Sequence, residues 1–153
     1  MQTRLDFKQA SPEAYKAMAN LEAQVKHSGL AAPLLELVRM RASQINGCAY
    51  CLDMHSKDAR AAGESEQRLY ALDAWRETPF FDARERAALE WTEAVTLIAD
   101  RHVPDEIYQR ARDVFSEQEL VNLTLAVIAI NGWNRMAITF RSPVGTYQPE
   151  LAK

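Results

Sequence analysis

The sequence predicts an all-α protein: a single domain, residues 1–153, built as a bundle of about seven helices. Three observations predict this class. Strand patterns are nearly absent, helix-capping residues and helix-ending glycines recur along the chain, and two long segments are apolar around most of their circumference. A length of 153 residues is sufficient for one domain with a buried core, and 48% hydrophobic with 25% charged residues is ordinary for a globular protein.

Short polar residues and prolines mark the helix starts, because they bind or replace N–H groups that the first turn leaves unpaired. Glycines mark the ends, because they readily adopt left-handed backbone. Asp82 with Glu85, and Ser116 with Glu119, have the spacing of capping boxes. In chain order, the signals that bound the expected helices are Ser11-Pro12 to Gly29, Pro33 to Asn46-Gly47, about Cys48 to Ala62 before Gly63, Ser65 to Pro79, Asp82 to about Asp100, Pro104 onward, and Ser116 to about Arg141, followed by an extended arm from Ser142 to Lys153.

The second and last of these helices are apolar on nearly all sides, which predicts burial against several neighbours. The residues concerned are Leu34, Leu35, Leu37, Val38, Met40, Ala42 and Ile45, and then Leu120, Leu123, Leu125, Val127, Ile128, Ile130 and Met136. So much apolar surface in a small chain also indicates a subunit interface. We therefore expect a homo-oligomer.

The charge and the termini limit the classes of partner. A formal charge of −3, with basic residues scattered among acids, argues against binding to nucleic acid or to an anionic membrane surface. The first eight residues contain no apolar segment of a signal peptide, and the apolar stretch 123–130 is too short to cross a bilayer. We expect a cytoplasmic protein, in which a structural disulfide is unusual and two closely spaced cysteines indicate redox or metal chemistry.

Cys48, Cys51 and His55 lie on one face of the third expected helix. The two sulfurs are three residues apart and can close a disulfide. At 1.5 Å per residue, His55 lies about 6 Å along the axis from Cys51 and about 10 Å from Cys48, so its imidazole is better placed to take the proton of Cys51. The helix N-terminus further favours a thiolate. This geometry predicts Cys51 as the attacking thiolate and Cys48 as the resolving thiol.

Other interpretations of these residues remain open at the level of pattern. The two cysteines and His55 could form part of a zinc site, although no second C-x-x-C is present and the other histidines are distant in sequence. Two free cysteines can also simply fill a core. Glu36, Arg39 and Ser43 form a polar stripe on the second helix, and the pattern alone favours a solvated ion pair between Glu36 and Arg39.

The spacing of Glu36, Cys48, Cys51 and His55, E-x11-C-x2-C-x3-H, resembles the core of the alkylhydroperoxidase AhpD-like, carboxymuconolactone decarboxylase superfamily. The stretches 103–117 and 131–135 are also similar to that family, so the resemblance covers a core of about residues 30–141, flanked by an N-terminal helix and a C-terminal arm. It implies an all-helical fold that assembles into dimers, trimers or hexamers. One departure is Tyr50, which stands between the cysteines where the best-known peroxidase of the family has histidine.

In the AhpD-like branch the second cysteine is the peroxidatic nucleophile, the first resolves it, and a glutamate and a histidine relay protons. The resemblance therefore implies these roles for Cys51, Cys48, Glu36 and His55, with no resident metal or cofactor. The expected function is a thiol-dependent peroxidase, or disulfide oxidoreductase, that reduces hydroperoxides and is reset by an external dithiol or protein reductant. The alternatives are a redox-sensing or binding protein without peroxide turnover, and a lactone-processing enzyme of the decarboxylase type.

Overall fold

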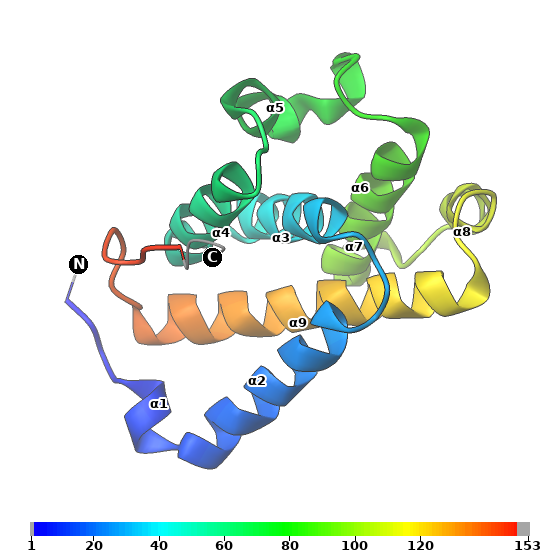
Figure 1. Cartoon of the computed structure of the whole chain (residues 1–153). Helices are drawn as coiled ribbons and strands as arrows, with labels where there is room; N and C mark the ends of the chain where they lie inside the picture. The colour runs from blue at the N-terminus through cyan, green and yellow to red at the C-terminus, as the bar shows by residue number, and fades with distance from the viewer. Residues whose placement is uncertain (1, 150–153) are drawn as a thin grey trace.

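The structure is a computed structural model that describes residues 2–149, with the backbone alone at residue 101. These residues form nine α-helices and one 3-10 helix, without a strand, so the predicted all-α class is confirmed. The longest helix, α9 (Glu117–Phe140), runs through the molecule; α2 (Pro12–Lys26) lies on one side of it, and α3 (Ala32–Asn46) with α6 (Ala83–Thr96) on the other (Figure 1). The helix α4 (Ala49–Ala61) packs against α3 and α9.

The predicted caps are present at the start of the two best-marked helices. Asp82 accepts a hydrogen bond from the N–H of Glu85, and Glu85 accepts one from the N–H of Asp82. Ser116 and Glu119 form the same reciprocal pair at the start of α9. Each box satisfies donors that the first turn would otherwise leave unpaired. Ser11 precedes α2 as expected, but its side chain makes no capping hydrogen bond.

The structure divides the chain more finely than the sequence analysis did. A short helix α1 (Phe7–Ala10) precedes α2. The fourth expected helix is two elements, α5 (Glu66–Ala71) and the 3-10 helix η1 (Leu72–Glu77), and within η1 the backbone of Ala74 is not helical. The fifth ends at Thr96, and α7 (Ile98–Arg101) follows as a separate turn before α8 (Asp105–Arg112). The third begins one residue later than expected, with Cys48 as the N-cap of α4.

Gly47 determines how α4 is placed. Its φ of 66° is a left-handed conformation that glycine adopts without strain, and it ends α3 directly before Cys48. The chain reverses at this point, so that α4 returns along α3. Consequently the first half of α3 lies beside the second half of α4. This arrangement explains how Glu36 can meet His55.

The described part of the C-terminal arm, residues 142–149, is extended as expected and lies along α4 (Figure 1). The arm leaves α9 at Arg141, whose backbone has a left-handed conformation with a φ of 56°. Three hydrogen bonds then hold it to α4: Gly145 N to Asp53 Oδ2 at 3.1 Å, Lys57 Nζ to the Tyr147 carbonyl at 3.0 Å, and the Tyr147 hydroxyl to Asp58 Oδ1 at 2.7 Å. The rest of the expected arm, residues 150–153, lies outside the described residues.

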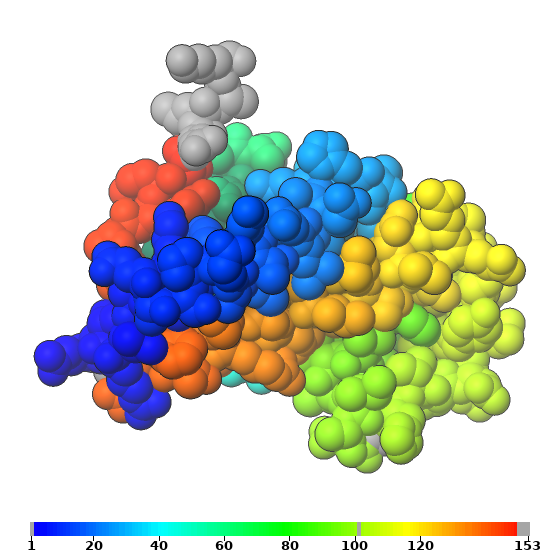
Figure 2. Space-filling model, turned by 90° about the horizontal axis from the view of Figure 1, so that it is seen from below, coloured from blue at the N-terminus to red at the C-terminus, as the bar shows by residue number. Residues whose placement is uncertain are grey.

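Burial follows the predicted apolar faces with one informative exception. In α3 every predicted apolar residue except the half-buried Ile45 is buried. In α9, Leu123, Val127 and Ile130 are buried. Ile128, however, is 51% exposed, and the side chains of Val121 and Ile138 are also exposed. Large apolar side chains of α9 are therefore left exposed by the described residues, and part of the surface of α9 is visible beside α2 in Figure 2. No described helix combines the length and the hydrophobicity needed to cross a membrane.

Candidate functional site

The two cysteines are joined as a disulfide at the start of α4. Their Cα atoms are 5.4 Å apart, and the Cys48 sulfur also accepts the N–H of Cys51 at 3.4 Å. Each cysteine is 1% exposed, and both pack in a small apolar cluster with Ala42, Ile130 and Ala137. The backbone thus already holds the pair at bonding distance, and little movement is needed to close or open the bond.

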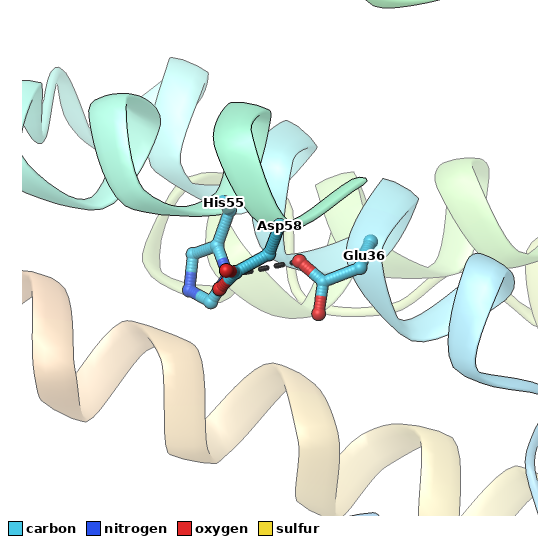
Figure 3. A group of neighbouring side chains, drawn as sticks. All are labelled: Glu36, His55 and Asp58. Carbon is cyan, nitrogen blue, oxygen red and sulfur yellow. Dashed lines mark hydrogen bonds and ion pairs between the residues drawn. The ribbon is translucent and has the colours of Figure 1, made fainter. Parts of the chain in front are cut away.

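His55 and Glu36 meet across the contact between α4 and α3. The imidazole Nδ1 lies 2.9 Å from Glu36 Oε2, and His55 is 7% exposed (Figure 3). The other oxygen, Oε1, accepts a hydrogen bond from Arg39 at 2.5 Å, and Arg39 also pairs with Glu22 of α2. The pair of Glu36 with Arg39 exists, but it is buried rather than solvated, since the Arg39 side chain is 7% exposed and that of Glu36 is 14% exposed.

The surroundings of Glu36 keep it ionised at neutral pH. Burial alone would raise the pKa of this carboxyl, but the hydrogen bond and charge of His55 and the neighbouring Arg39 outweigh burial and lower the pKa below its ordinary value of 4.5. An ionised carboxylate can only accept hydrogen bonds, so the Nδ1 of His55 must hold the proton between them. The other ring nitrogen points away from Glu36 and is left to exchange protons (Figure 3).

Asp58 is a member of this group that the sequence analysis missed. It lies one helical turn beyond His55. One ring nitrogen of His55 and one carboxylate oxygen each of Glu36 and Asp58 all lie within 4.8 Å of one another (Figure 3). The signal was present in the sequence, since Asp58 follows His55 at a spacing of three residues, which share a helix face. Asp53, five residues before Asp58 on α4, forms a separate ion pair of 2.9 Å with Lys57.

Glu36, His55 and Asp58 offer one nitrogen and two carboxylate oxygens, a donor set that suits a divalent transition metal. Their atoms are already engaged, however. Arg39 and His55 bind the two oxygens of Glu36, and the hydroxyl of Tyr147 binds Asp58 Oδ1. A cation would have to displace these bonds and approach the guanidinium that already balances the charge of Glu36. The arrangement fits proton exchange better than metal binding.

Tyr50, between the cysteines, is half-buried and packs against their cluster. Burial, followed by the charges of Tyr15, Asp53 and Asp58, raises the pKa of its phenol above the ordinary value of 10.0. The hydroxyl therefore stays protonated at neutral pH. It cannot replace a histidine as a group that changes charge in that range, but it can donate a hydrogen bond.

A buried amide network fixes the position of the cysteines from behind. Asn46, the last residue of α3, donates to Asn131 at 2.9 Å and to Asn134 at 2.8 Å, both on α9. Asn134 and Ser43 are fully buried, and the Asn134 amide donates to the Ser43 hydroxyl at 3.0 Å. No buried side-chain nitrogen or oxygen of the described residues lacks a hydrogen-bond partner, and this network holds the end of α3 in one register on α9. Cys48, the N-cap of α4, follows two residues after Asn46.

Glu36 also lines a cleft of about 500 Å³ between the start of α3, the end of α4 and α5. The apolar part of its wall includes Leu37, Ala59 and Phe80. Arg68, also in the wall, is paired with Glu64 and Glu85. The cleft gives the Glu36 end of the group contact with solvent, whereas the cysteines at the other end are covered.

A profile of the carboxymuconolactone decarboxylase family matches residues 12–94 of this chain. YdfG of Bacillus subtilis, an uncharacterised protein, is 45% identical over 138 residues, which cover 90% of this chain and 94% of YdfG. YnjA of Escherichia coli, also uncharacterised, is 32% identical over 117 residues, which cover 76% of this chain and 62% of YnjA.

Solved structures agree with these sequence matches. A crystal structure of a protein of unknown function from Agrobacterium tumefaciens, suggested to be the antioxidant defence protein AhpD, is 46% identical with a TM-score of 0.92, covering 95% of this chain and 100% of that one. The debrominase Bmp8 has the same fold, with a TM-score of 0.81 at 19% identity, covering 90% of this chain and 74% of Bmp8. At this lower identity the likeness concerns the fold alone.

Proposed function

Because this chain belongs to the carboxymuconolactone decarboxylase family and has an AhpD-like fold, we propose that it is a thiol-dependent peroxidase that reduces hydroperoxides through Cys48 and Cys51. The observation that supports this most directly is the closed cysteine pair on the same helix as a buried histidine that is itself held by a glutamate. Peroxide reduction by cysteine requires a thiolate, and a histidine held by a carboxylate can take up its proton and return it to the leaving alcohol.

In the proposed cycle the Cys51 thiolate attacks one oxygen of the hydroperoxide. A sulfur–oxygen bond forms, the oxygen–oxygen bond breaks, and the alcohol leaves with a proton supplied by His55. Cys51 is then a sulfenic acid. Cys48 attacks its sulfur, the disulfide forms, and the hydroxyl leaves as water with the proton of Cys48. An external dithiol reduces the disulfide in two exchange steps and restores both thiols.

Glu36 and His55 supply and remove the protons of this cycle. With Nδ1 bonded to Glu36, the imidazole exchanges protons through its other nitrogen, and the carboxylate stabilises the charged ring when it forms. Arg39 and Glu22 keep the carboxylate in place from the far side. The cleft at Glu36 offers a route by which these protons reach solvent.

We also propose that the protein acts as a homo-oligomer in the cytoplasm, without a resident cofactor. The exposed apolar residues of α9, Val121, Ile128 and Ile138, support an interface between copies, because exposed apolar surface often marks a protein–protein contact. A reducing compartment supports turnover, since the cycle needs a dithiol to reset the pair.

The test is a thiol count before and after one equivalent of a hydroperoxide, with mass spectrometry to locate the bond, followed by turnover with a dithiol. A peroxidase loses two thiols per chain, forms the Cys48–Cys51 bond and turns over repeatedly. A redox sensor would form the bond once without turnover, and a lactone-processing enzyme would keep its activity after both cysteines are replaced by serine. Either of these two results would reject the proposal.

A further inference from the structure

We propose that Asp58 and Tyr147 are positioning residues of the site, through which the C-terminal arm controls the reactivity of Cys51. The inference rests on the proposed role of Cys51 as the attacking thiolate. Asp58 contributes a second carboxylate beside His55, and the Tyr147 hydroxyl holds that carboxylate in place with a hydrogen bond of 2.7 Å. Neither residue belongs to the spacing that identified the site.

The arm is fixed at three points along one face of α4, so its position is well defined at Tyr147. Besides the bond to Asp58, the Tyr147 carbonyl accepts a hydrogen bond from Lys57, and Gly145 donates one to Asp53. The Tyr147 ring is partly buried rather than lying free on the surface. A hydroxyl held in this way restricts the rotamers of the Asp58 side chain and keeps its charge near the imidazole.

Charged and titratable groups surround His55 on each described element that packs near it. On α3 these are Glu36 and its partner Arg39, and Glu22 of α2 lies behind Arg39. On α4 they are Tyr50, Cys51 and Asp58, with Lys57 and its partner Asp53 beside the arm, and the arm itself contributes Tyr147. The α9 residues that pack at the cysteines, Ile130 and Ala137, are uncharged.

The effect of Asp58 on Cys51 is indirect and has a definite sign. Transfer of a proton from Cys51 to His55 places a positive charge within 4.8 Å of Asp58 and a negative charge about 10 Å from it, seven residues along the helix. Attraction to the nearer charge therefore exceeds repulsion from the farther one. At an effective dielectric constant of about 20, the difference favours the ion pair on the order of tenfold, or about one pH unit.

The experiment measures the rate of Cys51 alkylation by iodoacetamide against pH, with Cys48 replaced by serine so that one thiol remains. Asp58→Asn should move the midpoint of this profile upward by about one pH unit. Tyr147→Phe should move it in the same direction by roughly half as much, because the carboxylate remains but is less restrained. Asp58→Asn combined with Tyr147→Phe should equal Asp58→Asn alone, because in this proposal the Tyr147 hydroxyl affects Cys51 by way of Asp58.

Two variants on α5 serve as matched controls. Glu66→Gln removes one carboxylate and Tyr70→Phe removes one hydroxyl, and both should leave the midpoint unchanged. The inference is wrong if Asp58→Asn shifts the midpoint no more than Glu66→Gln, or if the effects of Asp58→Asn and Tyr147→Phe add. Circular dichroism checks folding, and Tyr147→Phe retains the ring, so it tests the inference even if Asp58→Asn does not fold.

Alkylation requires no peroxide, so this test is separate from the proposed function. A protein with the expected midpoints that does not turn over peroxide would reject the peroxidase proposal and leave the role of the arm standing. A peroxidase whose alkylation profile is indifferent to Asp58 and Tyr147 would reject the role of the arm alone.

Discussion

Replacement of Glu36 by glutamine is the most informative single change in this protein. Glutamine has nearly the same shape as glutamate and keeps an oxygen that Arg39 can bond. It removes the negative charge that holds the proton on the Nδ1 of His55. The variant therefore separates the role of Glu36 as a proton-exchanging group from its role in packing.

The expected loss of activity follows from the burial of this pair. A solvated ion pair would contribute less than about 1 kcal/mol to stability and nothing to catalysis. Here the Glu36 side chain is 14% exposed and bonds directly to His55. General acid–base participation accounts for about 10²–10⁴-fold in rate, so we expect Glu36→Gln to slow peroxide turnover by at least roughly tenfold.

The same variant should change how stability depends on pH. The pKa of Glu36 is lower in the folded chain than its ordinary value of 4.5. A lowered pKa means that the ionised form stabilises the fold above about pH 4.5 and that this contribution is lost as the pH falls through the folded pKa. The difference in free energy of unfolding between wild type and Glu36→Gln should thus be largest near neutral pH, at about 1–3 kcal/mol for hydrogen bonds to charged groups, and should shrink in acid.

Steady-state turnover and urea unfolding at pH 7 and pH 4 measure these two effects. The pH profile of Cys51 alkylation should also shift, because the carboxylate changes how the thiol and the imidazole share protons. Glu66→Gln, which removes a half-exposed glutamate paired with Arg60, is the control for loss of a surface carboxylate. Wild-type turnover in Glu36→Gln, with an unchanged alkylation profile, would show that Glu36 only packs. A stability difference that is equal at both pH values would refute the linkage.

Three further predictions concern the cysteines, metal and assembly. After peroxide treatment Cys48→Ser should accumulate a sulfenic acid at Cys51 that dimedone labels, and Cys51→Ser should leave Cys48 largely unreacted; equal labelling would reverse the assignment. Metal analysis of the reduced protein should find far less than one zinc per chain. About one zinc per wild-type chain that is absent from Cys48→Ser or from Asp58→Asn would overturn the redox interpretation. Light scattering should give a particle larger than the 17.3 kDa chain. Replacement of the exposed Ile128 of α9 by glutamate should weaken the association between copies. A monomer throughout the micromolar range contradicts the expectation.

The fold class could be predicted because its signals are local. A capping box such as that of Asp82 with Glu85 acts within one helical turn, and a left-handed glycine such as Gly47 ends a helix wherever it stands. The division of the fourth expected helix could not be predicted in this way. Its two parts, α5 and η1, are placed by tertiary packing: Leu69 of α5 and Leu72 and Trp75 of η1 are buried in one cluster with Leu37 and Leu89 from distant helices.

The site shows the same limit at the level of single residues. Cys48, Cys51 and His55 could be grouped from sequence because one helix holds all three. Glu36 joins them only through the reversal at Gly47, and Tyr147 reaches Asp58 only through the return of the arm along α4. Neither event has a short-range signal that specifies its partner. Asn46 and Asn131 illustrate this further, since each stands in an Ile-Asn-Gly triplet and their contact joins α3 to α9 across most of the chain.

These long-range contacts also distinguish a cysteine pair that reacts with peroxide from one that can only form a disulfide. The spacing of Cys48 and Cys51 permits a disulfide on any helix start, and the helix N-terminus favours a thiolate there without further help. Control of the proton requires groups from outside α4: Glu36 from α3, with Arg39 and Glu22 behind it, and Tyr147 from the arm. A relative with the two cysteines but without these partners should therefore form the bond and react with peroxide slowly. Removal of the partners from this chain one at a time should reproduce that behaviour while the disulfide still forms.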